Sequence, residues 1–214
     1  MKKYLLVEGI TDVAFVKYIC FKHGITQNFD DFKKDINQYT YKNFIIIDLS
    51  GQDKLTTELS FLKDEELKIS KIGIIQDADK DFDKSKNSID SAVSESKIET
   101  SKINYFLTPN NADSGDLETL LLSTLDYTAI PQLECFHAYA DCLKKHIDTT
   151  TKAMDKAKVY SYTMFSKEGK DYHIPHKSFM YKKNKKYIDT ELWDLEKTRF
   201  QPIINFILEI FQNN

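Results

Sequence analysis

Short apolar runs that alternate with helical stretches dominate the first half of this chain. Each run is continuous rather than alternating, as expected for a strand of a parallel sheet that is covered on both faces. The four runs lie at residues 4–7, 44–49, 72–75 and 103–107. The stretches between them repeat apolar residues at helical spacing, at about 11–24, 55–67 and 89–98. The order predicts an α/β domain built on a parallel sheet with right-handed crossovers.

The second half of the chain has mainly helical periodicity. Thr11 is expected to cap the first helix of the chain, whereas Pro131 and Pro202 suit the first turns of later ones. The later helices are expected at 116–125, 131–146, from Asp148 or Thr149 to 165, and 198–211. We therefore divide the chain into an α/β domain at 1–112 and a mainly helical C-terminal elaboration at 113–214 that packs on it.

Composition excludes several classes of protein. With 214 residues, 41% of them apolar, the chain can bury a core, and no run approaches the roughly 18 apolar residues of a membrane span. The net charge of −3 favours neither nucleic acid nor membrane as a partner. The apolar run that begins at Tyr4 is too short for a signal peptide, so we expect a cytoplasmic protein.

The three cysteines do not suggest a disulfide framework. Their number is odd and no pair has the C-x-x-C spacing, which also argues against a cysteine zinc site. Cys135 and Cys142 are seven residues apart, on one face of an expected helix, and are interpreted as buried small apolar residues.

Acidic residues follow two of the predicted strands. Glu8 ends the first strand, and Asp77 and Asp79 form a D-x-D motif after the third. Ligands of open parallel sheets bind beyond the carboxyl ends of the strands. In an extended D-x-D both carboxylates would point one way, and with Glu8 they would offer the oxygen ligands that Mg²⁺ or Mn²⁺ prefers. Taken singly, each motif is better explained by a solvated loop or a helix cap than by a metal ligand.

Taken together, these motifs resemble the Toprim domain of topoisomerases, primases and overcoming-lysogenization-defect nucleases. The matching segments are L-L-V-E-G-I-T-D at 5–12 and I-I-Q-D-A-D at 74–79. The resemblance implies a Toprim-like, Rossmann-like fold. It also implies that Glu8, Asp77 and Asp79 bind divalent metal and that Glu8 acts in phosphodiester chemistry.

Further segments resemble the overcoming-lysogenization-defect branch and small stand-alone Toprim-like proteins. Asp12 stands where that branch has a second acid, and S-G-D-L-E at 114–118 is similar to its later acidic element. Lys156 matches a lysine on a later helix of both groups, although Tyr160 and Tyr162 replace the His and Trp of the stand-alone proteins. No P-loop motif is present, so any regulatory ATPase would be a separate chain.

The resemblance adds a second set of candidate metal ligands. Asp12, Asp116 and Glu118, with the first set, could hold two cations about 4 Å apart, and Lys156 could neutralise charge in the transition state. Each residue also has a structural explanation. Acids at a helix start stabilise its dipole, which suits Asp116 and Glu118, and Lys156 could belong to a solvated face.

A lysine-rich stretch at 167–187 is the other candidate functional segment. It holds seven lysines against two acids and interleaves aromatic residues, a composition typical of single-strand nucleic-acid grooves. An exposed loop or hairpin whose aromatics pack on the body explains it as well. The candidate nucleic-acid contacts are Lys177, Lys182, Lys183, Lys185 and Lys186.

The sequence therefore predicts metal-dependent phosphodiester chemistry on nucleic acid, most simply a Toprim-like nuclease that uses Mg²⁺ or Mn²⁺. The alternative is a non-catalytic module of the same fold that binds nucleic acid or a partner protein. A phosphohydrolase or phosphotransferase acting on a small nucleotide is a third interpretation. The apolar stripe of the last expected helix is either core or a homodimer interface, and no membrane partner is expected.

Overall fold

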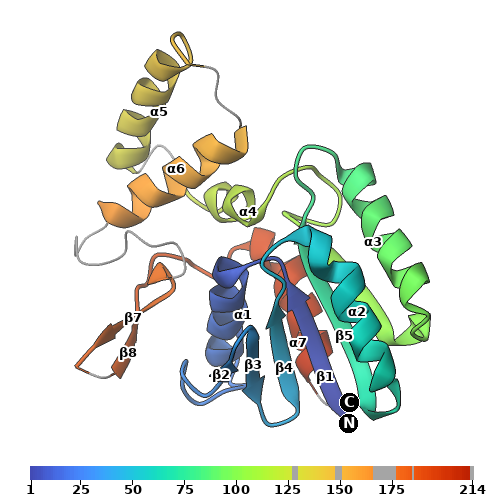
Figure 1. The fold of residues 1–214 in the computed structure, drawn as a ribbon. Helices are drawn as coiled ribbons and strands as arrows, with labels where there is room; N and C mark the ends of the chain where they lie inside the picture. Colours follow the sequence, from blue (N-terminus) through green and yellow to red (C-terminus); the bar gives the residue numbers. More distant parts are fainter. Residues whose placement is uncertain (127–129, 148–150, 166–176, 185, 213–214) are drawn as a thin grey trace.

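A six-stranded mixed sheet forms the centre of the molecule (Figure 1). The computed structural model describes residues 1–126, 130–147, 151–165, 177–184 and 186–212. The strands are β1 Lys2–Val7, β2 Lys33–Asp35, β3 Gln38–Tyr41, β4 Phe44–Asp48, β5 Ile69–Asp77 and β6 Ile103–Thr108. Their order across the sheet is β2-β3-β4-β1-β5-β6. The four apolar runs form the parallel part, from β4 to β6, which confirms the α/β class.

The expectation of a purely parallel sheet is wrong at one edge. β2 and β3 form an antiparallel hairpin, and β3 pairs antiparallel with β4. Of these seven residues only Tyr39 is buried, and β2 is a wholly exposed K-K-D. An edge hairpin with one buried side chain has no apolar run, so its sequence does not predict a strand.

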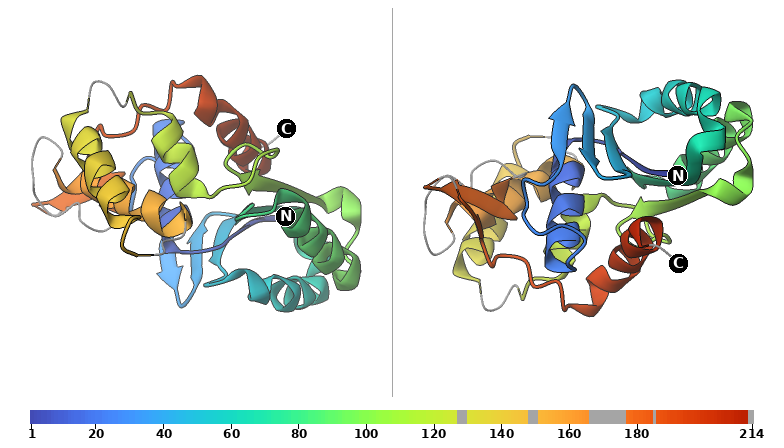
Figure 2. Two further views of the ribbon diagram at one scale, coloured as in Figure 1. Left: turned by 90° about the horizontal axis from the view of Figure 1, so that it is seen from above. Right: turned by 90° about the horizontal axis from the view of Figure 1, so that it is seen from below.

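Helices cover both faces of the sheet (Figure 2). The four that do so are α1 Ile10–Lys22, α2 Leu55–Asp64, α3 Phe82–Ser96 and α7 Gln201–Phe211. α1 and α7 lie on one face, and α2 and α3 on the other. α7 packs on β1, β5 and β6, so the α/β layers include residues from both ranges that the sequence analysis separated.

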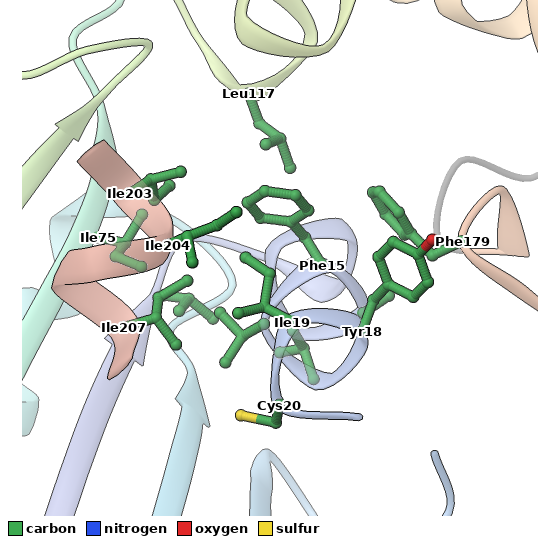
Figure 3. Close-up of a cluster of buried hydrophobic side chains, with 14 of the residues drawn as sticks. Phe15, Tyr18, Ile19, Cys20, Ile75, Leu117, Phe179, Ile203, Ile204 and Ile207 are labelled. Atoms are coloured by element: carbon green, nitrogen blue, oxygen red, sulfur yellow. The ribbon is translucent and has the colours of Figure 1, made fainter. Parts of the chain in front are cut away.

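The face covered by α1 and α7 holds the larger core (Figure 3). Phe15 of α1 lies between the rings of Phe179 and Phe200, with centroids 5.5 and 5.9 Å away. Ile203, Ile204 and Ile207 of α7 point toward the same cluster. The apolar stripe of the last helix is therefore core, as one of the two sequence interpretations had it.

The remaining elements form a second group above and beside α1 (Figure 1). They are α4 Leu117–Ser123, α5 Pro131–Leu143, α6 Thr151–Met164, β7 Met180–Lys183 and β8 Lys186–Asp189. The hairpin β7–β8 falls in the lysine-rich stretch and is tied to α1, because Asp189 accepts hydrogen bonds from Tyr18 Oη at 3.0 Å and Lys22 Nζ at 2.8 Å. Within the described ranges, no helix is long and apolar enough to cross a membrane.

Several helix boundaries differ from the expected ones. α1 begins at Ile10 with Gly9, not Thr11, at its N-cap. α3 begins at Phe82, because the Asp81 side chain caps it by accepting from the Lys84 N–H at 3.0 Å. Pro131 and Pro202 lie in first turns, as predicted. The expected cap at 148 or 149 falls outside the described residues.

The interpretation of the two helical cysteines as buried is wrong. Cys135 and Cys142 are exposed on α5, whereas Cys20 is buried in the core, and all three are free thiols. A seven-residue spacing places two side chains on one helix face without indicating whether that face is covered.

Gly73 fixes how closely α7 approaches the sheet. A Cβ at this position would lie 2.7 Å from Leu5 Cδ1 and 2.8 Å from Ile210 Cγ1. Gly73→Val should therefore lower the free energy of unfolding by about 2–3 kcal/mol through overpacking. Urea unfolding tests this, with Ser70→Val on the same strand as the control. Equal stability of the two variants would contradict the close approach.

Candidate functional site

The predicted first metal set lies at the carboxyl edge of the parallel strands. Glu8 directly follows β1 and Asp77 is the last residue of β5, and these strands are neighbours in the sheet. The Asp77 N–H donates to Glu8 Oε2 at 3.3 Å, so the two acids are in contact through the backbone. The strand pairing that the apolar runs predict is thus what brings them together.

Gln52 links the acids and was missed by sequence analysis. It begins a short 3-10 turn, Gln52–Lys54, that follows β4. Its side-chain Nε2 donates to Glu8 Oε2 at 3.0 Å and to Asp79 Oδ2 at 2.9 Å, with the Asp77 carbonyl 3.4 Å away. A single Gln after a strand is not a motif. The one feature of the sequence that could have indicated Gln52 is its position after β4, the strand that pairs with β1.

Asp77 is anchored in the protein. The residue is 8% exposed, and its Oδ1 accepts from Thr108 Oγ1 at 2.9 Å and from the Leu117 N–H at 3.2 Å. Asp77 therefore joins three elements, namely β5, the end of β6 and the start of α4. A rigid ligand held by its neighbours is what a precise binding site requires.

Asp79 departs from the extended geometry expected of the D-x-D. Its φ is +52°, in the left-handed region, and its N–H donates to the Gly115 carbonyl at 2.8 Å. The motif therefore turns between its two acids. Asp77 is held inside the protein, whereas Asp79 lines an open pocket and reaches Glu8 through Gln52.

Asp12 adds a fourth carboxylate to the group. Its Oδ2 accepts from the Gly9 N–H at 2.9 Å, which closes the first turn of α1. Burial and the charges of Asp77, Glu8 and Glu118 raise the pKa of Asp12 well above its ordinary value. Asp12 thus lies close enough to Glu8, Asp77 and Glu118 to be repelled by their charges.

Asp116 and Glu118 have different environments at the start of α4. Asp116 is 2% exposed and caps the helix, with Oδ1 accepting from the Thr119 N–H at 2.8 Å. The structural explanation of Asp116 is therefore confirmed. Glu118 is 7% exposed, and burial together with the charges of Asp116 and Asp77 raises its pKa to about 7, while Lys156 opposes the shift.

Helix α6 brings Lys156 to the acids. Lys156 is exposed, and its charge acts on Glu118 by lowering the pKa of that acid. Asp155, which the sequence analysis did not single out, lines the same pocket as Asp79 and accepts from Lys158 Nζ at 3.3 Å. Lys158, two residues after Lys156, is thus held in an ion pair with Asp155.

A pocket of about 810 Å³ opens beside these acids. It lies between the loop after β5, the start of α3, the start of α4 and α6. Its wall carries acids, lysines and hydroxyls, including Asp79, Lys80, Lys84, Ser85, Asp116 and Asp155. The mixture of anionic and cationic groups suits a phosphate-bearing ligand that is held together with a cation.

The donor set fits a hard divalent cation by its chemistry. All of the donors are carboxylate oxygens, with the mutual repulsion that a cation would relieve. Among the side chains outside the undescribed gaps, however, no three His, Cys, Asp or Glu residues already have the arrangement of a metal site. The Gln52 amide stands between Glu8 and Asp79 and bridges them by hydrogen bonds.

The candidate nucleic-acid lysines do not join the acidic cluster. Lys177 and Lys182 line a separate pocket beside α1, and Lys182 pairs with Asp30 at 3.4 Å. Lys183 and Lys186 are exposed at the tip of the hairpin β7–β8. Lys185 lies outside the described residues.

The comparisons with known proteins give a family without an activity. The family described as "Protein of unknown function (DUF3226)" matches residues 2–212. No curated protein and no solved structure matches the chain. Any functional inference therefore depends on the residues and their geometry.

Proposed function

The chain belongs to the DUF3226 family, and we propose that it is an enzyme that cleaves phosphodiester bonds in nucleic acid with the help of Mg²⁺ or Mn²⁺. One observation carries the proposal. Glu8 and Asp12 from the junction of β1 and α1, Asp77 from the end of β5 and Glu118 from α4 converge at the carboxyl edge of the sheet, where the other three charges act on Asp12. We also propose that the α/β layers are Toprim-like, since the matching motifs supply Glu8 and Asp77.

The residues divide into a binding group and a supporting group. Glu8, Asp77 and Asp79 would hold a first cation, and Asp12, Asp116 and Glu118 are the candidates for a second. A bound cation would supply a polarised water and a positive charge facing the leaving oxygen. Asp116 is the weakest of the candidates, because capping α4 already uses its Oδ1.

The supporting group acts through position and charge. Gln52 holds the carboxylates of Glu8 and Asp79 at a fixed separation by donating to both. Thr108 and the Leu117 N–H fix the orientation of Asp77. Lys156 is the cation near Glu118 that could neutralise charge on the phosphate in the transition state.

Gln52 also favours the second candidate function, a module that binds without catalysis. Its amide satisfies Glu8 and Asp79 by hydrogen bonds, so these two acids have partners with no cation present. A protein that had lost its metal could keep the same fold in this way. Metal binding separates the two functions directly.

Calorimetric titration with Mn²⁺ tests the proposal. We expect binding at tens of micromolar or tighter, and at least tenfold weaker binding in Asp79→Asn and Asp77→Asn, because each removes one negative ligand. Asparagine keeps an oxygen that can accept from Thr108 and Leu117, so the anchor of Asp77 is retained. Asp64→Asn, an exposed change at the far end of α2, is the matched control. A folded wild type that binds no Mn²⁺ would contradict the enzyme and favour the module.

A further inference from the structure

A second pocket lies along α1, on the side that faces the hairpin β7–β8 and strand β3. Its volume is about 390 Å³. The residues that matter here are Ile10, Lys17, Phe29, Tyr39, Lys182 and Tyr187, all of which line it. The lining combines aromatic rings with ammonium groups, whereas the pocket beside the acids is lined by acids, lysines and hydroxyls.

Lys17 is the unusual member of this lining. It is 9% exposed, and within the described ranges its ammonium has neither a hydrogen bond nor an ion pair. Its Nζ lies over the ring of Phe29 at 4.4 Å and near that of Tyr39 at 5.9 Å. Burial lowers the pKa of Lys17, and the charge of Asp30 opposes this. Lys17 lines the pocket, so an anion that enters the pocket can pair with its ammonium.

The aromatic walls offer flat surfaces beside that ammonium. The rings of Phe29 and Tyr187 have centroids 5.0 Å apart. Lys182 Nζ lies 5.1 Å from the centroid of Tyr187 and 3.4 Å from Asp30. Aromatic faces next to cations are the surfaces on which unpaired nucleobases stack while their phosphates are neutralised.

The pocket adjoins the acidic cluster through α1. Ile10 is the first residue of the helix and directly follows Gly9, whose N–H binds Asp12. Lys17 lies five residues after Asp12, about 7.5 Å along the helix axis. Asp12 and Lys17 are also about 140° apart around the helix, so a chain molecule must pass around the start of α1, where Ile10 lines the pocket, to place one unit at the acids and an adjoining unit in the pocket.

We propose that this pocket receives one unstacked nucleotide of a single-stranded nucleic acid, with the base against the aromatic walls and a phosphate oxygen at Lys17. The volume of about 390 Å³ lies in the range of small-ligand pockets, which suits one such unit. The inference rests on the proposed function and deepens it, because it names single-stranded nucleic acid as the substrate class.

Fluorescence anisotropy with fluorescein-labelled decathymidylate, in EDTA so that no cleavage occurs, tests this pocket. We expect Lys17→Met to weaken binding about tenfold, and Tyr187→Leu to weaken it by a similar factor. Methionine keeps the apolar stem of Lys17, and thermal unfolding confirms that each variant is folded. Lys68→Met, an exposed change directly before the first residue of β5, should bind as the wild type does.

The outcomes separate this inference from the proposed function. Three results would overturn the proposal that this pocket binds a nucleotide. The wild type does not bind the probe, or both Lys17→Met and Tyr187→Leu bind it as tightly as the wild type does. The third is that the wild type binds a blunt ten-base-pair duplex with equal affinity. Competition by thymidine monophosphate alone at the polymer's affinity would also overturn it, because the site would then be one for a free nucleotide. Lys17-dependent binding without any Mn²⁺ binding would support the pocket while contradicting the enzyme.

Discussion

Glu8→Gln is expected to lower the rate of phosphodiester cleavage by about a thousandfold, the order lost when one preorganised electrostatic partner is removed from an active site. Glu8 is the acid that the Asp77 backbone and Gln52 both hold in place. Glutamine keeps an oxygen that can accept both hydrogen bonds, so the change removes a charge with little effect on the fold. The measurement is the cleavage of a labelled single-stranded oligonucleotide in Mn²⁺.

The matched control for this variant is Glu95→Gln, an exposed change near the end of α3. It alters the net charge equally and should leave the cleavage rate unchanged. If the wild type cleaves and Glu8→Gln cleaves at the same rate, Glu8 has no part in the chemistry. Gln52→Ala should fall between the two, because it removes the bridge but none of the carboxylates.

The sequence predicted the parts of the site that depend on continuous apolar strands. Once two such strands are neighbours, the residues that follow them lie at one edge of the sheet, which is why Glu8 and Asp77 meet. Asp12 was a candidate through the resemblance, and it joins these acids because it lies in the first turn of the helix after the first strand. For Glu8 and Asp77 the prediction needed only the strand order and the position of each acid after its strand.

The rest of the site depends on turns and on long-range packing, which leave weak signals. Asp79 takes a left-handed conformation because its N–H pairs with Gly115, a contact 36 residues away that no local pattern reveals. Gln52 reaches Glu8 and Asp79 because it follows β4, and since Gln is common in loops, its residue type alone does not indicate this role. Lys17 and Tyr187 meet at one pocket only because the hairpin β7–β8 packs against α1.

The metal-free protein should lose stability as the pH rises from about 5 to 8. Glu118 has a pKa of about 7 in the folded chain, above its ordinary value of 4.5. Between these values the folded state binds a proton that the unfolded chain releases, so the free energy of unfolding falls with increasing pH. A shift of this size corresponds to roughly 3 kcal/mol. Asp12, whose pKa is also raised, changes the stability in the same direction.

Glu118→Gln isolates this effect, because glutamine carries no charge at any of these pH values. In EDTA its free energy of unfolding, measured in urea at pH 5.5 and pH 8, should fall less than that of the wild type by about 2 kcal/mol. Glu134→Gln, at an exposed position of α5, should retain the wild-type dependence. If Glu118→Gln has the same pH dependence as the wild type, ionising Glu118 in the folded protein costs little free energy. In that case the acids at the sheet edge do not repel one another strongly enough to require a cation.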